Sequence, residues 1–234
     1  MRRSLEKEMM DLPDQPKQLL EEDLRNLRII NRYLGGYRSV MRGIAQLTGE
    51  RKINGFSLLD AGTGSGDIPA AIARWAKSRG VSMKIVALDP EPTTVMAAAV
   101  QTKGFPEISV VRGDAMAPPF PSSSFDFVLA SQLLHHFSEE QIIAVLKTWS
   151  GIARKAIIVS DLIRHPVAYC GIRVITRLFT RNIMTLTDAP LSVKRAFTRA
   201  EWRDLFLRAA IGPFQISSVF PYRMVTTFSL AGSR

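Results

Sequence analysis

The stretch from Leu58 to Asp67 carries the clearest chemical signal in the chain. An apolar run ends at the acid Asp60, and glycines then stand at Gly62, Gly64 and Gly66. This pattern predicts a buried strand that ends in a tight turn and leads into a helix. Glycine is needed where the backbone takes positive φ, or where a ligand approaches without meeting a Cβ. We therefore expect a ligand-binding loop at the carboxyl end of a first strand.

Two classes of ligand suit such a loop. Dinucleotide-binding loops have the spacing G-x-G-x-x-G, whereas the glycines here follow G-x-G-x-G. Asp67 would place a negative charge at the start of the helix, where a pyrophosphate would otherwise sit. S-adenosylmethionine (SAM) has no phosphate and carries a sulfonium and an ammonium, so an acid-rich loop favours it. A plain glycine-rich turn is the alternative interpretation.

This stretch resembles motif I of the class I SAM-dependent methyltransferases, and the resemblance extends over about residues 52–231. It implies an α/β fold with a Rossmann-like seven-stranded sheet and a C-terminal antiparallel hairpin. N-terminal helices and a helical lid insertion would be added to that sheet. The expected strands lie at 56–59, 84–88, 108–111, 125–131, 156–160, 215–220 and 223–230.

The resemblance also implies which residues hold SAM, with S-adenosylhomocysteine (SAH) as the product. Asp89 would bind the two ribose hydroxyls, because an ionised carboxylate offers two acceptor oxygens. Asp114 and Ala115 match the family's adenine-binding step, although an isolated Gly-Asp pair is more often a turn. The full expected set is Asp60, Ala61, Gly62, Thr63, Gly64, Gly66, Asp89, Pro90, Asp114, Ala115, Ser131 and Gln132.

Candidate catalytic residues follow the fourth and fifth expected strands. A phenol or enol acceptor benefits from a general base. We expect His136 or His135 to be that base, with Asp161 orienting the base or the substrate. A hydrogen-bonded turn is the alternative interpretation of the histidine pair. His165 is an outside candidate, or a structural residue next to a helix start.

Several helices are expected around this core. Residues 1–16 are polar with two prolines and are expected to form a loose arm. Helices expected at 17–34 and about 37–47 would cover the substrate mouth or pack on the domain edge. Asp67 is expected to cap the helix that follows the glycine loop. The helix expected at 92–104 would turn four residues inward, namely Val95, Met96, Ala99 and Val100.

An insertion separates the fifth strand from the next helix. The 36 residues between Asp161 and Thr198 exceed what a simple connection needs, and they hold six cations against one acid. Arg173, Arg177 and Arg181 recur at i, i+4 and predict a basic stripe on one helix. We expect a substrate lid that takes a hydrophobic acceptor, with transient membrane-surface contact as a further hypothesis. A solvated basic face is the alternative.

These elements divide the chain into four expected parts. The first is an N-terminal helical arm (1–50), which is followed by the SAM-binding core (51–162). The lid insertion (163–197) comes next, and the end of the core (198–234) supplies a helix and the terminal hairpin.

Composition bounds the function further. The chain has 234 residues, a net charge of +10, one cysteine and three histidines. A single cysteine cannot form an internal disulfide, and so few histidines leave little for zinc, so no metal is expected. No signal peptide or membrane span is predicted, so a cytoplasmic protein is expected. The positive net charge suggests attraction to nucleic acid, anionic lipid or an acidic partner. The alternative is that the charge serves solubility alone.

A narrower resemblance concerns residues 31–36, 160–164 and 189–193, which are similar to a bacterial subgroup of polyketide and isoprenoid-type metabolism. A more distant similarity is to quinone-biosynthesis methyltransferases. The resemblance implies methyl transfer to oxygen or carbon of a small, hydrophobic aromatic, phenolic, quinone or polyketide acceptor.

Two alternatives remain open at this stage. The charge motivates an RNA methyltransferase, but the motif Pro118-Pro119-Phe120 precedes the fourth strand instead of following it, and no catalytic cysteine pair exists. Nucleic acid is therefore disfavoured. The other alternative is a non-catalytic SAM-binding protein, although the set Asp60, Asp89 and Asp114 argues against lost binding.

Overall fold

The computed structural model describes residues 1–49 and 54–230. At its centre lies a seven-stranded sheet with the order β3-β2-β1-β4-β5-β7-β6. The strands are β1 (Gly55–Ala61), β2 (Ser82–Asp89), β3 (Ile108–Arg112), β4 (Phe125–Ser131), β5 (Ala153–Leu162), β6 (Phe214–Val219) and β7 (Arg223–Ser229). β7 runs antiparallel to both β5 and β6, and the remaining pairs are parallel. The predicted sheet with its C-terminal antiparallel hairpin is confirmed.

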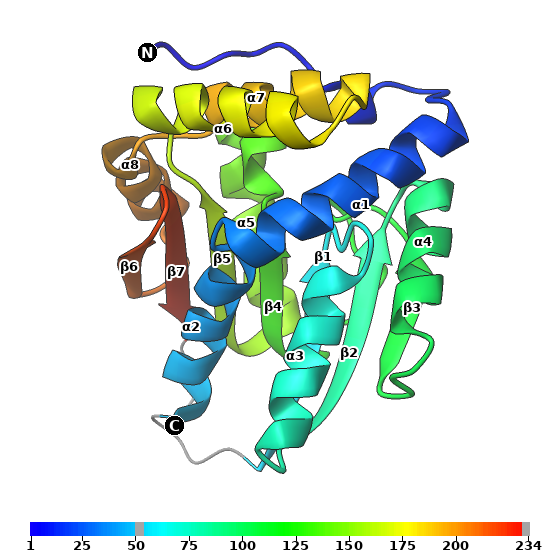
Figure 1. Cartoon of the computed structure of the whole chain (residues 1–234). Helices are drawn as coiled ribbons and strands as arrows, with labels where there is room; N and C mark the ends of the chain where they lie inside the picture. The colour runs from blue at the N-terminus through cyan, green and yellow to red at the C-terminus, as the bar shows by residue number, and fades with distance from the viewer. Residues whose placement is uncertain (50–53, 231–234) are drawn as a thin grey trace.

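Helices cover both faces of this sheet (Figure 1). One face carries α2 (Gly36–Gly49), α3 (Asp67–Ser78) and α4 (Pro92–Thr102), and the other carries α5 (Glu139–Ile152) and α8 (Arg199–Ala209). The central strands read as continuous apolar runs because they are buried on both sides. The helix starts at Ser138 and Thr198 are capping boxes, in which the hydroxyl accepts from the third helical amide.

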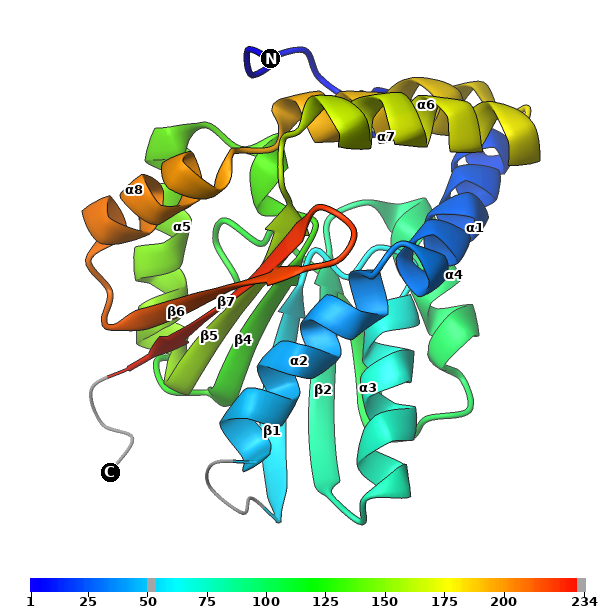
Figure 2. The same cartoon turned by 60° about the vertical axis from the view of Figure 1, so that its left-hand side comes forward.

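Three further helices lie across the carboxyl ends of the strands (Figure 2). They are α1 (Lys17–Tyr33), α6 (Pro166–Phe179) and α7 (Ile183–Arg195), and the last two form the predicted helical insertion. Two short 3-10 helices, η1 (Met9–Asp11) and η2 (Leu134–His136), lie near them. Among the described residues, no helix is long and apolar enough to cross a membrane.

The N-terminal segment, residues 1–16, is not the loose arm that was expected. The Ser4 amide donates to the Lys194 carbonyl at 3.0 Å, and Arg3 Nε donates to the Arg195 carbonyl at 2.7 Å. The Glu8 side chain is only 1% exposed. Polar groups of this segment form hydrogen bonds with α7 and η2, which lie far away in the sequence.

The interior face of α4 also differs from the expectation. Met96, Ala99 and Val100 are exposed, whereas the small residues Ala98 and Thr102 are buried. A Cβ on Gly66 would lie 3.1 Å from both Ala98 and Thr102, so the turn before α3 packs closely on α4. Only small side chains fit between these elements, and the larger ones therefore face outward.

Other local expectations need correction. Gly66, with φ of +73°, is the residue that precedes α3, so Asp67 is the first helical residue and not its cap. Arg181 follows the end of α6, where Asn182 caps α7, so the basic stripe consists of Arg173 and Arg177. Asp161 lies within β5 instead of following it. The expected boundary at residues 50/51 lies outside the described residues.

A buried hydrogen bond between α5 and the loop after β3 gives a test of this packing. Trp149 is fully buried, and its indole N–H donates to the Ala115 carbonyl at 2.9 Å. Trp149→Phe leaves that carbonyl unpaired and a small cavity, which is expected to lower the free energy of unfolding by about 1–3 kcal/mol. Urea denaturation measures this loss. Trp75→Phe, at a half-buried position on α3, is the control and is expected to cost less than about 1 kcal/mol.

Candidate cofactor loop and histidine site

The glycine loop after β1 has the conformation that its sequence requires. Gly62, Gly64 and Gly66 all have positive φ, at +71°, +56° and +73°. The amides of Gly62 and Thr63 both donate to the Leu88 carbonyl at 2.9 Å, which ties the loop to the end of β2. Apart from its chain neighbours, no atom of the described residues lies within 4 Å of a Cβ built on Gly64. The loop therefore presents open backbone to a ligand at Gly64.

Two carboxylates are buried beside this loop. Asp60 Oδ2 accepts from Thr63 Oγ1 at 2.7 Å, while its Oδ1 is buried and has no hydrogen-bond partner in the described structure. Asp89 accepts from the Gly64 amide at 3.0 Å and from the Glu91 amide at 3.2 Å. Burial raises the pKa of Asp60 to about 7 and that of Asp89 to about 6. A bound cation would favour their ionised forms.

The other expected cofactor residues lie along the same edge of the sheet. Ala61 ends β1, and Pro90 follows β2. Ala115 is buried, whereas Asp114 is exposed and accepts from the Met116 amide at 2.8 Å. Ser131 ends β4, and its buried hydroxyl has no partner among the described residues. The orphaned oxygens and the open glycine backbone fit a polar, cationic ligand such as SAM.

A chain of hydrogen bonds joins the glycine loop to α1 and β4. The Asn31 amide donates to Asp67 Oδ2 at 3.2 Å, and Gln132 Nε2 donates to the Asn31 side-chain oxygen. Asn31 is buried, although it stands on a helix whose inner face is otherwise mainly aliphatic. The sequence analysis did not assign Asn31 to the site, although residues 31–36 contribute to the narrower resemblance and Asn31 places an amide on the buried face of an amphipathic helix.

An apolar cavity of about 230 Å³ opens beside Gln132, beneath α6 and α7. The cavity is lined mainly by aliphatic side chains from the three helices above the sheet, and Tyr222 and Arg223 close one side. Representative lining residues are Leu27 and Ile30 from α1, Ile172 and Ile175 from α6, and Val193 from α7. It therefore lies where the expected lid meets the expected cofactor edge.

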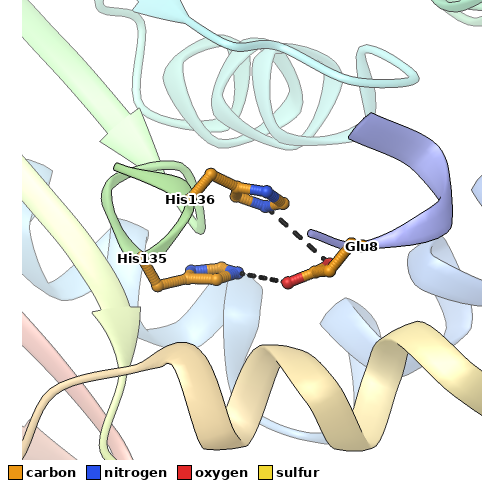
Figure 3. Close-up of side chains that lie close together, drawn as sticks. All are labelled: Glu8, His135 and His136. Atoms are coloured by element: carbon orange, nitrogen blue, oxygen red, sulfur yellow. Dashed lines mark ion pairs between the residues drawn. The ribbon is translucent and has the colours of Figure 1, made fainter. Parts of the chain in front are cut away.

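The structure brings the predicted catalytic residues together, and Figure 3 shows the two histidines beside Glu8. His135 Nδ1 lies 2.7 Å from Asp161 Oδ1, and both side chains are buried. His136 Nδ1 lies 2.8 Å from Asp11 Oδ2. The Nε2 atoms of the two histidines lie 3.6 and 3.9 Å from the Oε1 and Oε2 atoms of Glu8. Glu8 and Asp11 were missed, because the N-terminal segment was expected to be loose.

Charged residues of α7 hold the N-terminal segment on the histidine pair. Asp188 accepts from the backbone amides of Met9 and Met10 at 2.9 and 3.0 Å. Arg195 Nη2 donates to the His136 carbonyl at 2.7 Å. Burial raises the pKa of Glu8 to about 7. Asp188, the one acid of the insertion, therefore holds the N-terminal segment in place. The cation-rich sequence around Asp188 did not predict this contact.

His165 lies apart from this cluster. Its Nδ1 accepts from the Val167 amide at 3.2 Å, which caps α6, and its ring stacks on Tyr222 with centroids 4.5 Å apart. These contacts match the alternative interpretation of His165 as a structural residue next to a helix start.

Residues 58–155 match the family model described as "Methyltransferase domain". No curated protein sequence matches the chain at a significant level. Similar solved structures include human N-acetylserotonin methyltransferase in complex with SAM (TM-score 0.66, 17% identity, covering 98% of this chain and 63% of that chain). A putative O-methyltransferase from Nostoc punctiforme has a TM-score of 0.59 and 19% identity, over 84% of this chain and 56% of that chain.

A third similar structure is magnesium protoporphyrin IX methyltransferase from Synechocystis with bound SAH (TM-score 0.58, 16% identity, 84% of each chain). This chain thus covers less than two thirds of the length of the first two proteins. At these identities the likeness establishes the fold, which all three share with this chain.

The raised pKa of Asp60 predicts a pH dependence of stability. Between about pH 4 and 7 the folded protein holds a proton that the unfolded chain has released, so stability falls as pH rises through that window. Asp60→Asn removes this loss, and the variant is expected to be more stable than wild type at pH 8 by up to about 4 kcal/mol. The difference is expected to shrink toward pH 4.

Thermal or urea unfolding of the ligand-free protein between pH 4 and 8 measures the effect. Asp204→Asn, at an exposed acid on α8, is the matched control and should keep the wild-type pH profile. Identical pH profiles for wild type and Asp60→Asn would contradict the assigned electrostatics.

Proposed function

Because this chain carries a class I SAM-dependent methyltransferase domain, we propose that it transfers a methyl group from SAM to a small hydrophobic acceptor. The acceptor atom is an oxygen or a carbon of an aromatic, phenolic, quinone or polyketide compound. The observation that carries this proposal is the apolar cavity beside Gln132, which the Asn31 side chain links to the glycine loop. A second substrate bound there would lie next to the expected cofactor site.

The character of the cavity favours a small molecule over RNA. Its lining is mainly aliphatic and is covered by helices, whereas surfaces that bind single-stranded RNA carry basic grooves and stacking aromatic side chains. We therefore assign residues 1–50 and 163–197 to acceptor binding, and residues 51–162 and 198–234 to the cofactor-binding core.

When bound, SAM supplies an electrophilic methyl group on a good leaving group. The chain's own residues would hold it at Asp60, Asp89 and the glycine loop. Alignment and exclusion of water can then supply most of the rate, and α6 and α7 provide the cover that excludes water.

The general base proposed for a phenolic acceptor is His135, oriented by Asp161, or its neighbour His136. Donation of the His135 Nδ1 proton to Asp161 leaves Nε2 as the proton-accepting atom. That atom faces Glu8. Proton transfer from an acceptor hydroxyl therefore requires Glu8 to move away from His135.

Filling the cavity tests acceptor binding. Gly171 lines it, and outside its own helical turn a Cβ on Gly171 would meet no atom of the described part of the chain within 4 Å, so Gly171→Leu is expected to fold and to occupy cavity volume. The purified protein is incubated with SAM and a panel of phenols and quinones, and SAH release is measured. We expect Gly171→Leu to raise KM for the active acceptor at least tenfold without changing SAH affinity.

Gly151→Leu is the matched control, because Gly151 also stands exposed on a helix with open space for a Cβ and lies on α5, outside the cavity. Its kinetics should equal those of wild type. Methyl transfer to purified RNA with none to any phenol or quinone would contradict the proposed acceptor class.

We further propose that the outer face of α6 meets an anionic membrane surface and loads the cavity from it. Val174 and Leu178 form an exposed apolar stripe, with exposed fractions of 58% and 83%. Arg173 and Arg177 lie on the same exposed helix. Apolar side chains beside cations suit an interface of anionic head groups and acyl chains.

Co-sedimentation with vesicles tests this contact. Leu178→Glu places a negative charge on the stripe and is expected to reduce binding to phosphatidylglycerol-containing vesicles at least fivefold. Leu207→Glu, at an exposed leucine on α8, is the control and should bind as wild type does. Equal sedimentation of both variants and wild type would contradict a role for α6.

A further inference from the structure

Glu8, His135 and His136 turn their side chains toward one point between the N-terminal segment and η2 (Figure 3). One potential ligand atom from each lies within 4.8 Å of the others. The distances from the histidine Nε2 atoms to the Glu8 oxygens, 3.6 and 3.9 Å, are too long for hydrogen bonds. They approach the separation of about 3.4 Å between two ligands on one tetrahedral zinc ion, given zinc–ligand bonds of about 2.0–2.1 Å.

Two of these atoms face each other without a proton donor between them. His135 Nε2 and Glu8 Oε1 are both buried and have no hydrogen-bond partner in the described structure. Because His135 Nδ1 donates to Asp161, the facing Nε2 atom is an acceptor, as is the Glu8 oxygen. Two buried acceptors at this distance are unfavourable unless a cation or a proton lies between them.

The carboxylates behind the two histidine rings also suit a metal. Each histidine holds a carboxylate on its Nδ1 atom, Asp161 for His135 and Asp11 for His136. Metal-binding histidines commonly donate their other ring N–H to a carboxylate, which fixes the ring and raises its basicity. Both rings are thus fixed with Nε2 directed at Glu8.

The local charge leaves room for a dication. Arg195 Nε lies 3.7 Å from Glu8 Oε1, but this N–H donates to the His135 carbonyl. Among the described residues, the carboxylates of Glu8 and Asp11 share a single guanidinium within 4 Å, that of Arg195, which lies 3.7 Å from each.

We propose that Glu8, His135 and His136 bind one divalent transition-metal ion, with Zn²⁺ as the best match to two imidazoles and a carboxylate. The ion fastens residues 1–16 to η2 and leaves a fourth position for water. It also takes the Nε2 atom of His135, so it opposes the base role of that residue; this consequence alone rests on the proposed function. This proposal departs from the composition-based expectation of no metal.

The test is calorimetric titration of the chelator-treated full-length protein with Zn²⁺, together with visible absorption after Co²⁺ addition. Wild type is expected to bind one ion per chain and to give the intense d–d bands of tetrahedral Co²⁺. Glu8→Gln and His136→Gln are expected to lower Zn²⁺ affinity at least tenfold and to weaken those bands. Glu6→Gln and His165→Gln are matched controls outside the cluster and should bind as wild type does.

Each variant is also titrated with SAH, which reports on the cofactor site and on folding. A variant that binds SAH but has lost Zn²⁺ supports the metal site. Absence of Zn²⁺ binding in wild type, or full Zn²⁺ affinity in Glu8→Gln, would overturn it in favour of a proton shared in the cluster. Failure of wild type to bind SAH would instead count against the proposed function and leave the zinc result intact.

Discussion

Three carboxylates are buried at one edge of the sheet, and the neighbouring helices and loops are arranged around them. Asp60, Asp67 and Asp89 are all buried around the glycine loop, and within the described residues none forms an ion pair with a cationic side chain. Their charge is met by hydroxyl and amide donors and by loop backbone. This arrangement costs stability in the ligand-free protein and creates a site whose electrostatics favour a cation.

The helices above the sheet are organised around that edge. α1 contributes Asn31, whose side-chain amide donates to Asp67 and whose side-chain oxygen accepts from Gln132, so one polar connection joins the glycine loop to the apolar cavity. α6 and α7 cover the cavity with aliphatic side chains, and α7 anchors the N-terminal segment through Asp188. One layer of helices therefore covers the cavity and surrounds the histidine pair.

The sequence allowed accurate prediction where the signal is local. Glycine spacing and apolar runs identified the loop and the strands, because each depends on neighbouring residues. Contacts between distant segments left no such signal. Glu8 lies in a polar segment that resembles a loose arm, and its pairing with His135 depends on the folded position of α7. The exposure of Met96 was likewise set by the close approach of Gly66 to α4.

Binding of SAM and SAH at the glycine loop is tested by calorimetric titration of wild type and of Asp89→Ala. We expect micromolar binding to wild type and its loss in Asp89→Ala, because the buried Asp89 carboxylate accepts a hydrogen bond from the Gly64 amide at the open part of the loop. Tighter binding of SAM than of SAH would reflect the additional positive charge. No binding of either compound to folded wild-type protein would contradict a cofactor site here and leave the glycine loop as a structural turn.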